Sequence, residues 1–124
     1  MKTYFLLIAA CLSLELSAQS TTPTVKVLTF NILHGATTEG TFDLDVIAKV
    51  IKDADPDFVA LQEVDFKTNR AKGYDLATEL GWRTKMVALF GKAMPYDGGE
   101  YGEGMLSKHS ILSSRNVPLP FSPG

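Results

Sequence analysis

Two stretches decide the fold of this chain, residues 27–35 (VLTFNILHG) and residues 58–65 (FVALQEVD). Each is an apolar run that ends on a polar side chain, Asn31 in the first and Glu63 in the second. A strand buried on both faces is a nearly continuous apolar run, and ligands bind where such strands end in an open sheet. Either residue alone is explained as a surface strand cap. The same layout in two successive strands favours a site.

A helix is predicted between these two strands. Asp43 is a good N-cap residue, and Pro56 ends the segment because the residue before a proline is pushed out of the helical region. Apolar side chains follow the i, i+3, i+4, i+7 spacing of one helix face: Leu44, Ile47, Ala48 and Ile51. The strand, helix, strand order indicates a crossover unit of an α/β architecture, with the strand directions left open.

The patterns weaken after residue 65. We expect a charged loop over residues 66–73 and a short helix over residues 75–80. Gly81 is expected to end that helix at the C′ position, and residues 82–90 are expected to form a strand.

Residues 91–104 contain five glycines and are expected to form a flexible loop. The loop lacks the Lys-Ser or Lys-Thr ending of a phosphate-binding P-loop. Residues 105–107 and 111–119 are expected to form a final strand pair.

Length and charge limit the function classes. The chain has 124 residues, enough for one domain, with 12 basic and 14 acidic residues and a net charge of −2. No basic surface is available to hold nucleic acid through release of counterions. A bound metal ion could still supply positive charge to a nucleic-acid substrate.

The first residues have the pattern of a targeting segment. Residues 1–19 are predicted to be a signal peptide, residues 20–24 a linker, and the protein secreted or periplasmic. The apolar run is too short to span a membrane, so no transmembrane segment is expected in the mature chain. As an alternative, residues 8–11 (IAAC) resemble a lipobox, in which Cys11 would carry a lipid anchor. Ordinary signal-peptide cleavage, after Ala18 or Gln19, would instead leave a mature chain without cysteine and therefore without a disulfide.

Three motifs together carry a family resemblance: residues 29–35 (TFNILHG), 61–65 (LQEVD) and 98–108 (GGEYGEGMLSK). They resemble the endonuclease/exonuclease/phosphatase superfamily, which has the DNase I-like fold. The resemblance implies an α/β fold, a four-layered α/β sandwich of which this chain carries the N-terminal half. Residues 25–124 would then be such a domain, truncated at its C-terminus.

The resemblance also implies chemistry, because members of the superfamily hydrolyse phosphoester bonds with a divalent metal, Mg²⁺ or Mn²⁺. Glu63 matches the metal-ligand glutamate, and hard cations do prefer carboxylate oxygens. Asn31 matches an asparagine that binds the metal or orients the attacking water, a catalytic role. His34, Arg70 and Tyr101 are candidate substrate-binding residues. Their plainer interpretations are a loop histidine, a solvated arginine and a tyrosine that anchors a turn.

One part of the family pattern is not matched. Nothing after Leu119 supplies the Asp-x-Asn motif or the late Asp-His pair of the family, and His109 is assigned no catalytic role. We therefore expect the N-terminal half of a secreted, metal-dependent phosphodiesterase, phosphatase or nuclease, inactive by itself. The alternative is a non-catalytic fragment with at most weak metal affinity.

The substrate is left open among small-molecule, lipid and nucleic-acid phosphoesters. The acidic charge favours a small or lipid phosphoester over duplex DNA. No obligate protein partner is expected.

Overall fold

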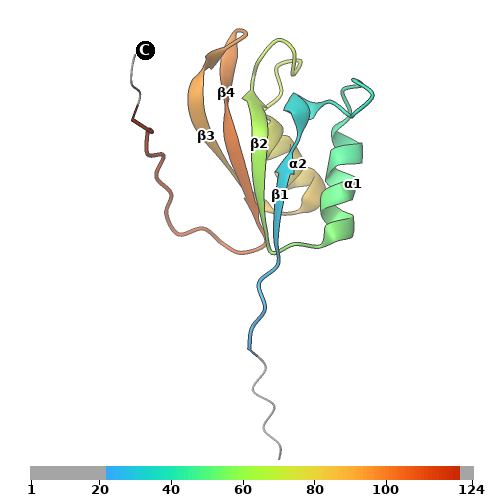
Figure 1. Ribbon diagram of the computed structural model, residues 1–124, viewed down its shortest axis with the longest axis vertical. Helices are drawn as coiled ribbons and strands as arrows, with labels where there is room; N and C mark the ends of the chain where they lie inside the picture. The colour runs from blue at the N-terminus through green and yellow to red at the C-terminus, as the bar shows by residue number, and fades with distance from the viewer. Residues whose placement is uncertain (1–21, 121–124) are drawn as a thin grey trace, which may run out of the picture.

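The computed structural model describes residues 22–120. The predicted signal peptide, including Cys11, lies outside this range. A single sheet packs against two helices on one of its faces (Figure 1). The elements are, in chain order, β1 (Val27–Asn31), η1 (Leu33–Gly35), α1 (Leu44–Ala54), β2 (Phe58–Phe66), α2 (Leu76–Thr84), β3 (Val87–Tyr96) and β4 (Gly99–Ser107).

The predicted crossover unit is confirmed. β1 pairs with β2 in parallel, from Val27 opposite Phe58 to Asn31 opposite Gln62, and α1 connects them. The Asp43 carboxylate caps α1 by accepting from the main-chain N–H groups of Asp45 and Val46. The order of the sheet is β1-β2-β4-β3, and β4 is antiparallel to both of its neighbours.

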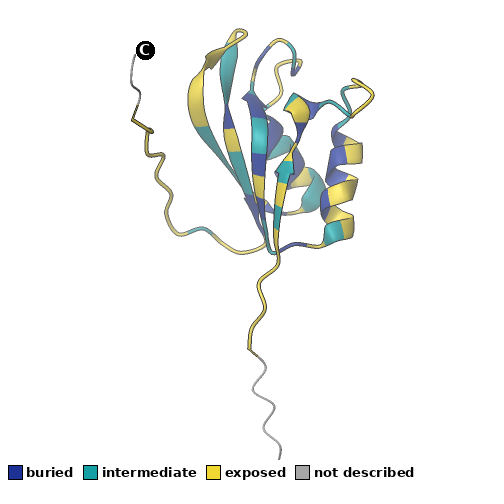
Figure 2. Cartoon of the chain, viewed as in Figure 1, coloured by how far each residue is buried: buried dark blue, intermediate teal, exposed yellow. Residues whose placement is uncertain are grey.

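Both helices cover the same face of this sheet, and one apolar core lies between them and the strands (Figure 2). The opposite face is open, with Thr29 and Ala60 exposed. The α/β class is therefore confirmed, as one sheet with one helix layer. The core side chains are Ile32, Leu44, Ile47, Ala48, Ile51, Val59, Leu61, Val64, Ala71, Leu76, Ala77, Leu80, Met86 and Leu106.

The predicted end of the second helix is wrong. α2 continues through Gly81 and Trp82 and ends at Thr84, followed by Lys85 as a C-cap in the left-handed conformation. Gly81 is required for close packing instead, because a Cβ there would lie 2.9 Å from both the Ala88 Cβ and the Met86 carbonyl oxygen. The expected strand over residues 82–90 consequently begins only at Val87.

The glycine-rich stretch is not the expected flexible loop. β3 and β4 form a hairpin through it, and the chain turns at Asp97 and Gly98, both with positive φ. An Asp-Gly pair of this kind is typical of two-residue hairpin turns. Glycine composition alone concealed the strands.

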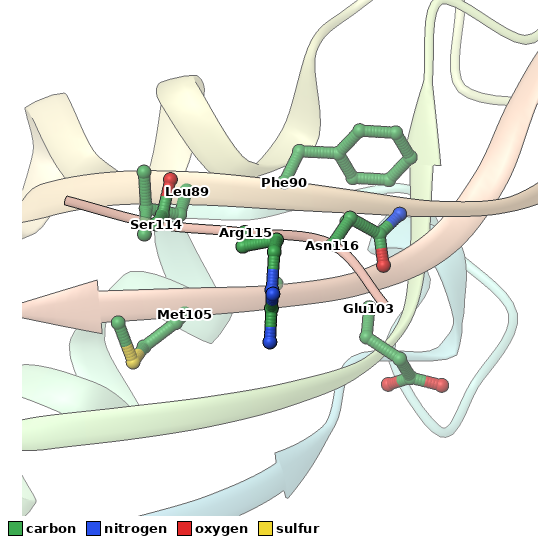
Figure 3. A pocket seen from close by; sticks show the side chains of 9 residues that line it. Leu89, Phe90, Glu103, Met105, Ser114, Arg115 and Asn116 are labelled. Atoms are coloured by element: carbon green, nitrogen blue, oxygen red, sulfur yellow. The ribbon is translucent and has the colours of Figure 1, made fainter. Parts of the chain in front are cut away.

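The expected final strand pair is also wrong. Residues 105–107 belong to β4, and residues 111–119 contain no strand. This last segment runs beside β3, where the Asn116 Nδ2 donates to the Lys92 carbonyl at 2.8 Å. Between it and the β3–β4 hairpin is a cavity of about 240 Å³ whose lining includes Leu89, Met105 and Arg115 (Figure 3).

Among residues 22–120, no helix has the length and apolar character needed to cross a membrane.

Candidate active site

A β-bulge sets the direction of Glu63. Leu61 pairs with Gly104 and Val64 with Gly102, so that two residues of β2, Gln62 and Glu63, face one residue of β4. Glu63 has a φ of 56°, in the left-handed region that non-glycine residues rarely adopt. Bulges of this kind redirect a side chain and are frequent beside active sites.

Asn31 and Glu63 are in direct contact. The Asn31 Nδ2 donates to the Glu63 Oε1 at 2.8 Å, and the Asn31 Oδ1 accepts from the Leu33 main-chain N–H at 2.9 Å. The parallel pairing of β1 and β2 places both residues at the carboxyl ends of neighbouring strands. The two residues predicted to share a site are therefore brought together.

His34 approaches Glu63 from the turn after β1. Leu33 and His34 both have positive φ, 46° and 47°, an uncommon pair for residues with a Cβ. The His34 Nδ1 lies 3.7 Å from the Glu63 Oε2, and this buried nitrogen has no hydrogen-bond partner in the described part of the chain. Backbone strain and an unsatisfied polar atom at one place are typical of functional sites.

Arg70 is held by a buried carboxylate. Its Nε donates to the Asp65 Oδ2 at 2.7 Å and its Nη2 to the Asp65 Oδ1 at 2.9 Å, while Asp65 is fully buried. Burial alone would raise the pKa of Asp65, but the hydrogen bonds from Arg70 and Thr68 lower it below its ordinary value. Arg70 is therefore bound as part of the fold, with about a third of its side chain exposed.

Tyrosines border Arg70 on the hairpin side. The guanidinium carbon lies 4.4 Å from the ring centre of Tyr96 and 5.6 Å from that of Tyr101. Burial raises the pKa of Tyr101, and the charge of Glu63 raises it further. Tyr101 thus belongs to the same electrostatic environment as Glu63.

Glu103, on β4 opposite the bulge, is a further acid at this site that the sequence analysis missed. Its pKa is raised, first by burial and then by the charge of Glu63. Its position in a glycine-rich stretch gave no signal. Asp65 was likewise not predicted as a site residue, although the spacing Asp65, Thr68, Arg70 is compatible with a local ion pair.

The structure therefore gathers all five predicted site residues at one end of the sheet: Asn31, His34, Glu63, Arg70 and Tyr101. Within residues 22–120, no group of three or more His, Cys, Asp or Glu side chains is placed to hold a metal ion. Glu63 and Asn31 do offer the oxygen ligands that Mg²⁺ prefers, since this ion is often held by one or two carboxylates with water and substrate phosphate completing its shell.

Two cavities border this group, the first through Glu103 and the second through Asn31. The one in Figure 3 is not lined by Asn31, Glu63 or Arg70. The second, of about 320 Å³, lies between β1 and α1, and its lining includes Asn31 among mostly apolar side chains such as Phe30, Val46 and Val50. Neither cavity gathers the polar side chains described above.

Comparisons with known proteins identify the family of the chain. The model of the endonuclease/exonuclease/phosphatase family matches residues 28–123. No curated protein matches the sequence.

Solved structures show the fold. An endonuclease/exonuclease/phosphatase from Beutenbergia cavernae DSM 12333 is similar with a TM-score of 0.59 and 24% identity, over 73% of this chain and 27% of that one. A family protein from Leptotrichia buccalis C-1013-b is similar with a TM-score of 0.56 and 20% identity, over 73% of this chain and 40% of that one. The chain thus corresponds to less than half the length of these relatives.

Proposed function

Because the chain belongs to the endonuclease/exonuclease/phosphatase family, we propose that it supplies the metal-binding wall of a phosphoester hydrolase that uses Mg²⁺ or Mn²⁺. The observation that carries the proposal is the Glu63 carboxylate. It is held by Asn31 through one oxygen on a strained bulge, and its other oxygen accepts no hydrogen bond from the described residues. A carboxylate fixed in this way is prepared for a cation.

Each residue has a role in this proposal. Glu63 and Asn31 would hold the ion, which when bound neutralises charge on the phosphate and on the leaving oxygen. Asn31 keeps the carboxylate in place through its amide, and its own oxygen is fixed by the Leu33 N–H. His34, Arg70 and Tyr101 would contact the phosphoester.

Arg70 has N–H donors that are not engaged by Asp65 and could serve this role. A guanidinium has five N–H groups, and Asp65 takes two of them. A third lies within 3.4 Å of the Tyr96 hydroxyl. The remaining pair suits the oxygens of a phosphate, and the ion pair with Asp65 keeps the guanidinium charged and oriented.

Catalysis is proposed to need residues beyond those described. Glu63 and Asn31 give at most a few of the six oxygens that surround Mg²⁺, and a general base must reach the proton that it takes. We expect the 124 residues alone to bind the ion weakly and to hydrolyse no phosphoester. The acidic net charge favours a small or lipid phosphoester as the substrate of the whole protein.

Export is part of the proposal. Residues 1–19 are proposed to be a signal peptide, with the lipid-anchored Cys11 as the alternative. Fractionation of bacterial cells that express the chain, with mass measurement of its N-terminus, tests this. A mature chain that retains residue 1 in the cytoplasm would contradict export.

Titration with Mn²⁺ tests the metal site directly. Paramagnetic broadening of NMR signals should be strongest at Asn31, His34 and Glu63, and Glu63→Gln should weaken Mn²⁺ binding about tenfold or more. Glu100→Gln is the matched control, because it removes a glutamate charge from β4 at a residue that pairs with Lys92, and it should have a much smaller effect. Mn²⁺ binding that is unchanged in Glu63→Gln would contradict the proposed site.

A parallel assay with bis(p-nitrophenyl) phosphate and Mg²⁺ tests whether further residues are needed. We expect no turnover above background from the 124-residue chain. Turnover that Glu63→Gln abolishes would show that these residues suffice for catalysis.

A further inference from the structure

The turn of the β3–β4 hairpin is bound tightly to the loop that carries Arg70. The Asp97 Oδ2 accepts from the Arg70 main-chain N–H at 2.8 Å, and its Oδ1 accepts from the Asn69 Nδ2 at 3.2 Å. The Asp97 carbonyl also accepts from the Asn69 main-chain N–H at 2.9 Å. One turn residue thus makes three hydrogen bonds to two adjacent loop residues.

The packing between the turn and the loop leaves no room for a Cβ at Gly99. A Cβ on Gly99 would lie 2.3 Å from the Phe66 carbonyl oxygen, and one on Gly98 would lie 2.9 Å from the Asn69 Nδ2. Only glycine permits backbones to approach this closely. The glycines that suggested a flexible loop therefore serve to fix the hairpin against the loop.

Arg70 is held from two directions as a result. Asp65, on β2, fixes the guanidinium, whereas Asp97, on the hairpin, fixes the main chain of the same residue. Tyr96, directly before Asp97 in the chain, places its ring 4.4 Å from the Arg70 guanidinium. The position of the guanidinium therefore depends on how the hairpin is seated.

We propose that Asp97 is a positioning residue, which fixes the loop at Asn69 and Arg70 so that the Arg70 donors not engaged by Asp65 face the phosphate of the substrate. The phosphate contact rests on the proposed function. The positioning of Arg70 does not, and it can be measured alone. Asp97 itself touches neither metal nor phosphate.

The test uses NMR of the isotope-labelled 124-residue chain. The Arg70 Nε–H signal is identified by its loss in Arg70→Lys, and its hydrogen-exchange rate reports how firmly the guanidinium is held. Asp97→Ala should raise this rate about tenfold, as expected for the loss of a hydrogen bond to a charged group. Exchange of the β4 amide N–H groups should stay unchanged, which a general destabilisation of the hairpin would not allow.

Two further variants serve as controls. Asp97→Asn should restore slow exchange, because its amide oxygen can still accept the Arg70 main-chain N–H. Glu100→Gln, on the same hairpin, removes only the exposed ion pair with Lys92 and should leave the Arg70 signal unaltered. An Arg70 signal that exchanges equally slowly in Asp97→Ala would overturn the proposal.

Titration of inorganic phosphate in the presence of Mg²⁺ separates the two proposals. We expect Asp97→Ala to weaken phosphate binding about tenfold while Mn²⁺ binding at Glu63 is retained. If Asp97→Ala loosens Arg70 but phosphate binds equally to the wild type and to Arg70→Lys, the positioning by Asp97 is upheld and the phosphate role of Arg70 fails.

Discussion

The two ends of the β1–β2 pair both carry charged side chains, but they use them differently. At the amino end, the Lys108 Nζ binds the Asp55 Oδ1 at 2.5 Å and the Lys26 main-chain N–H donates to the Asp57 Oδ2 at 2.8 Å. The Lys108 Nζ also donates to the Asp55 main-chain carbonyl at 3.3 Å, and all of these contacts are exposed. At the carboxyl end, Asp65 is fully buried, and Glu63 has a left-handed backbone conformation inside a strand, whereas the left-handed Asp55 at the amino end is the C-cap of α1.

The charged side chains at the amino end form exposed ion pairs, whereas those at the carboxyl end are fixed by burial and by the backbone. The exposed ion pair at the amino end adds little to the free energy of unfolding, because water competes for both partners. The carboxyl end contains a desolvated ion pair, backbone strain and an unsatisfied nitrogen on His34, each of which costs free energy. A fold retains such features where they serve a site.

The largest expected effect at the carboxyl end is that of Asp65→Asn. We expect it to lower the free energy of unfolding by about 3 kcal/mol, because it leaves the Arg70 charge without its partner. The value lies at the low end for buried pairs, since Arg70 is 31% exposed and can turn to water. Urea denaturation measures the change, and Asp65→Asn/Arg70→Gln should be less destabilised than the sum of the two single variants.

Acidification should weaken the ion pair between Asp65 and Arg70, because Asp65 loses its charge at low pH. The folded-state pKa of Asp65 is lowered, so its stabilising contribution is complete above the ordinary pKa of about 4 and is lost as the pH falls through the folded-state value. Glu103 acts in the opposite sense. Its folded-state pKa is raised, so its charge destabilises the fold above that value, and the cost disappears as the carboxylate gains a proton.

Urea denaturation at a series of pH values would show this. The wild type should lose stability below about pH 4, and Asp65→Asn should show a flatter acid limb. Equal acid limbs in the two proteins would mean that Asp65 does not titrate as the structure indicates.

The smallest expected effect is at the amino end. Lys108→Ala should leave the thermal unfolding midpoint nearly unchanged, because the pair with Asp55 is exposed. It should raise the pKa of Asp55 toward its ordinary value, since the hydrogen bond and charge of Lys108 hold it low. NMR titration of the Asp55 carboxyl measures this. A clear loss of stability would remove the contrast between the two ends.

Sequence patterns predicted the first half of the structure because its signals are local and consistent. The cap at Asp43, the helical apolar spacing and Pro56 all indicate the same helix, and two apolar runs flank it. The parallel pairing then brings Asn31 to Glu63, as the resemblance implied.

The second half was less predictable because its glycines have tertiary functions. Gly81 lies inside α2 to admit β3, and Gly99 lies at a strand start to admit the Phe66 carbonyl. In both cases the reason is contact with a distant backbone, which local propensity does not record. The bulge at Gln62 and Glu63 shifts the alternation of β2 by one residue, so that Val64 and not Asp65 continues the apolar face of Val59 and Leu61. The burial of Asp65 depends instead on Thr68 and Arg70, which donate to its carboxylate from the loop after β2.

The left-handed backbone of Glu63 implies a conflict between folding and activity at a single position. For an L-residue with a Cβ this conformation costs about 1 kcal/mol, a cost that glycine avoids. Selection for stability alone would therefore favour Glu63→Gly, and it would remove the carboxylate proposed to hold the metal. If this position keeps its glutamate in descendants of the chain, the glutamate is retained for function at a cost in stability.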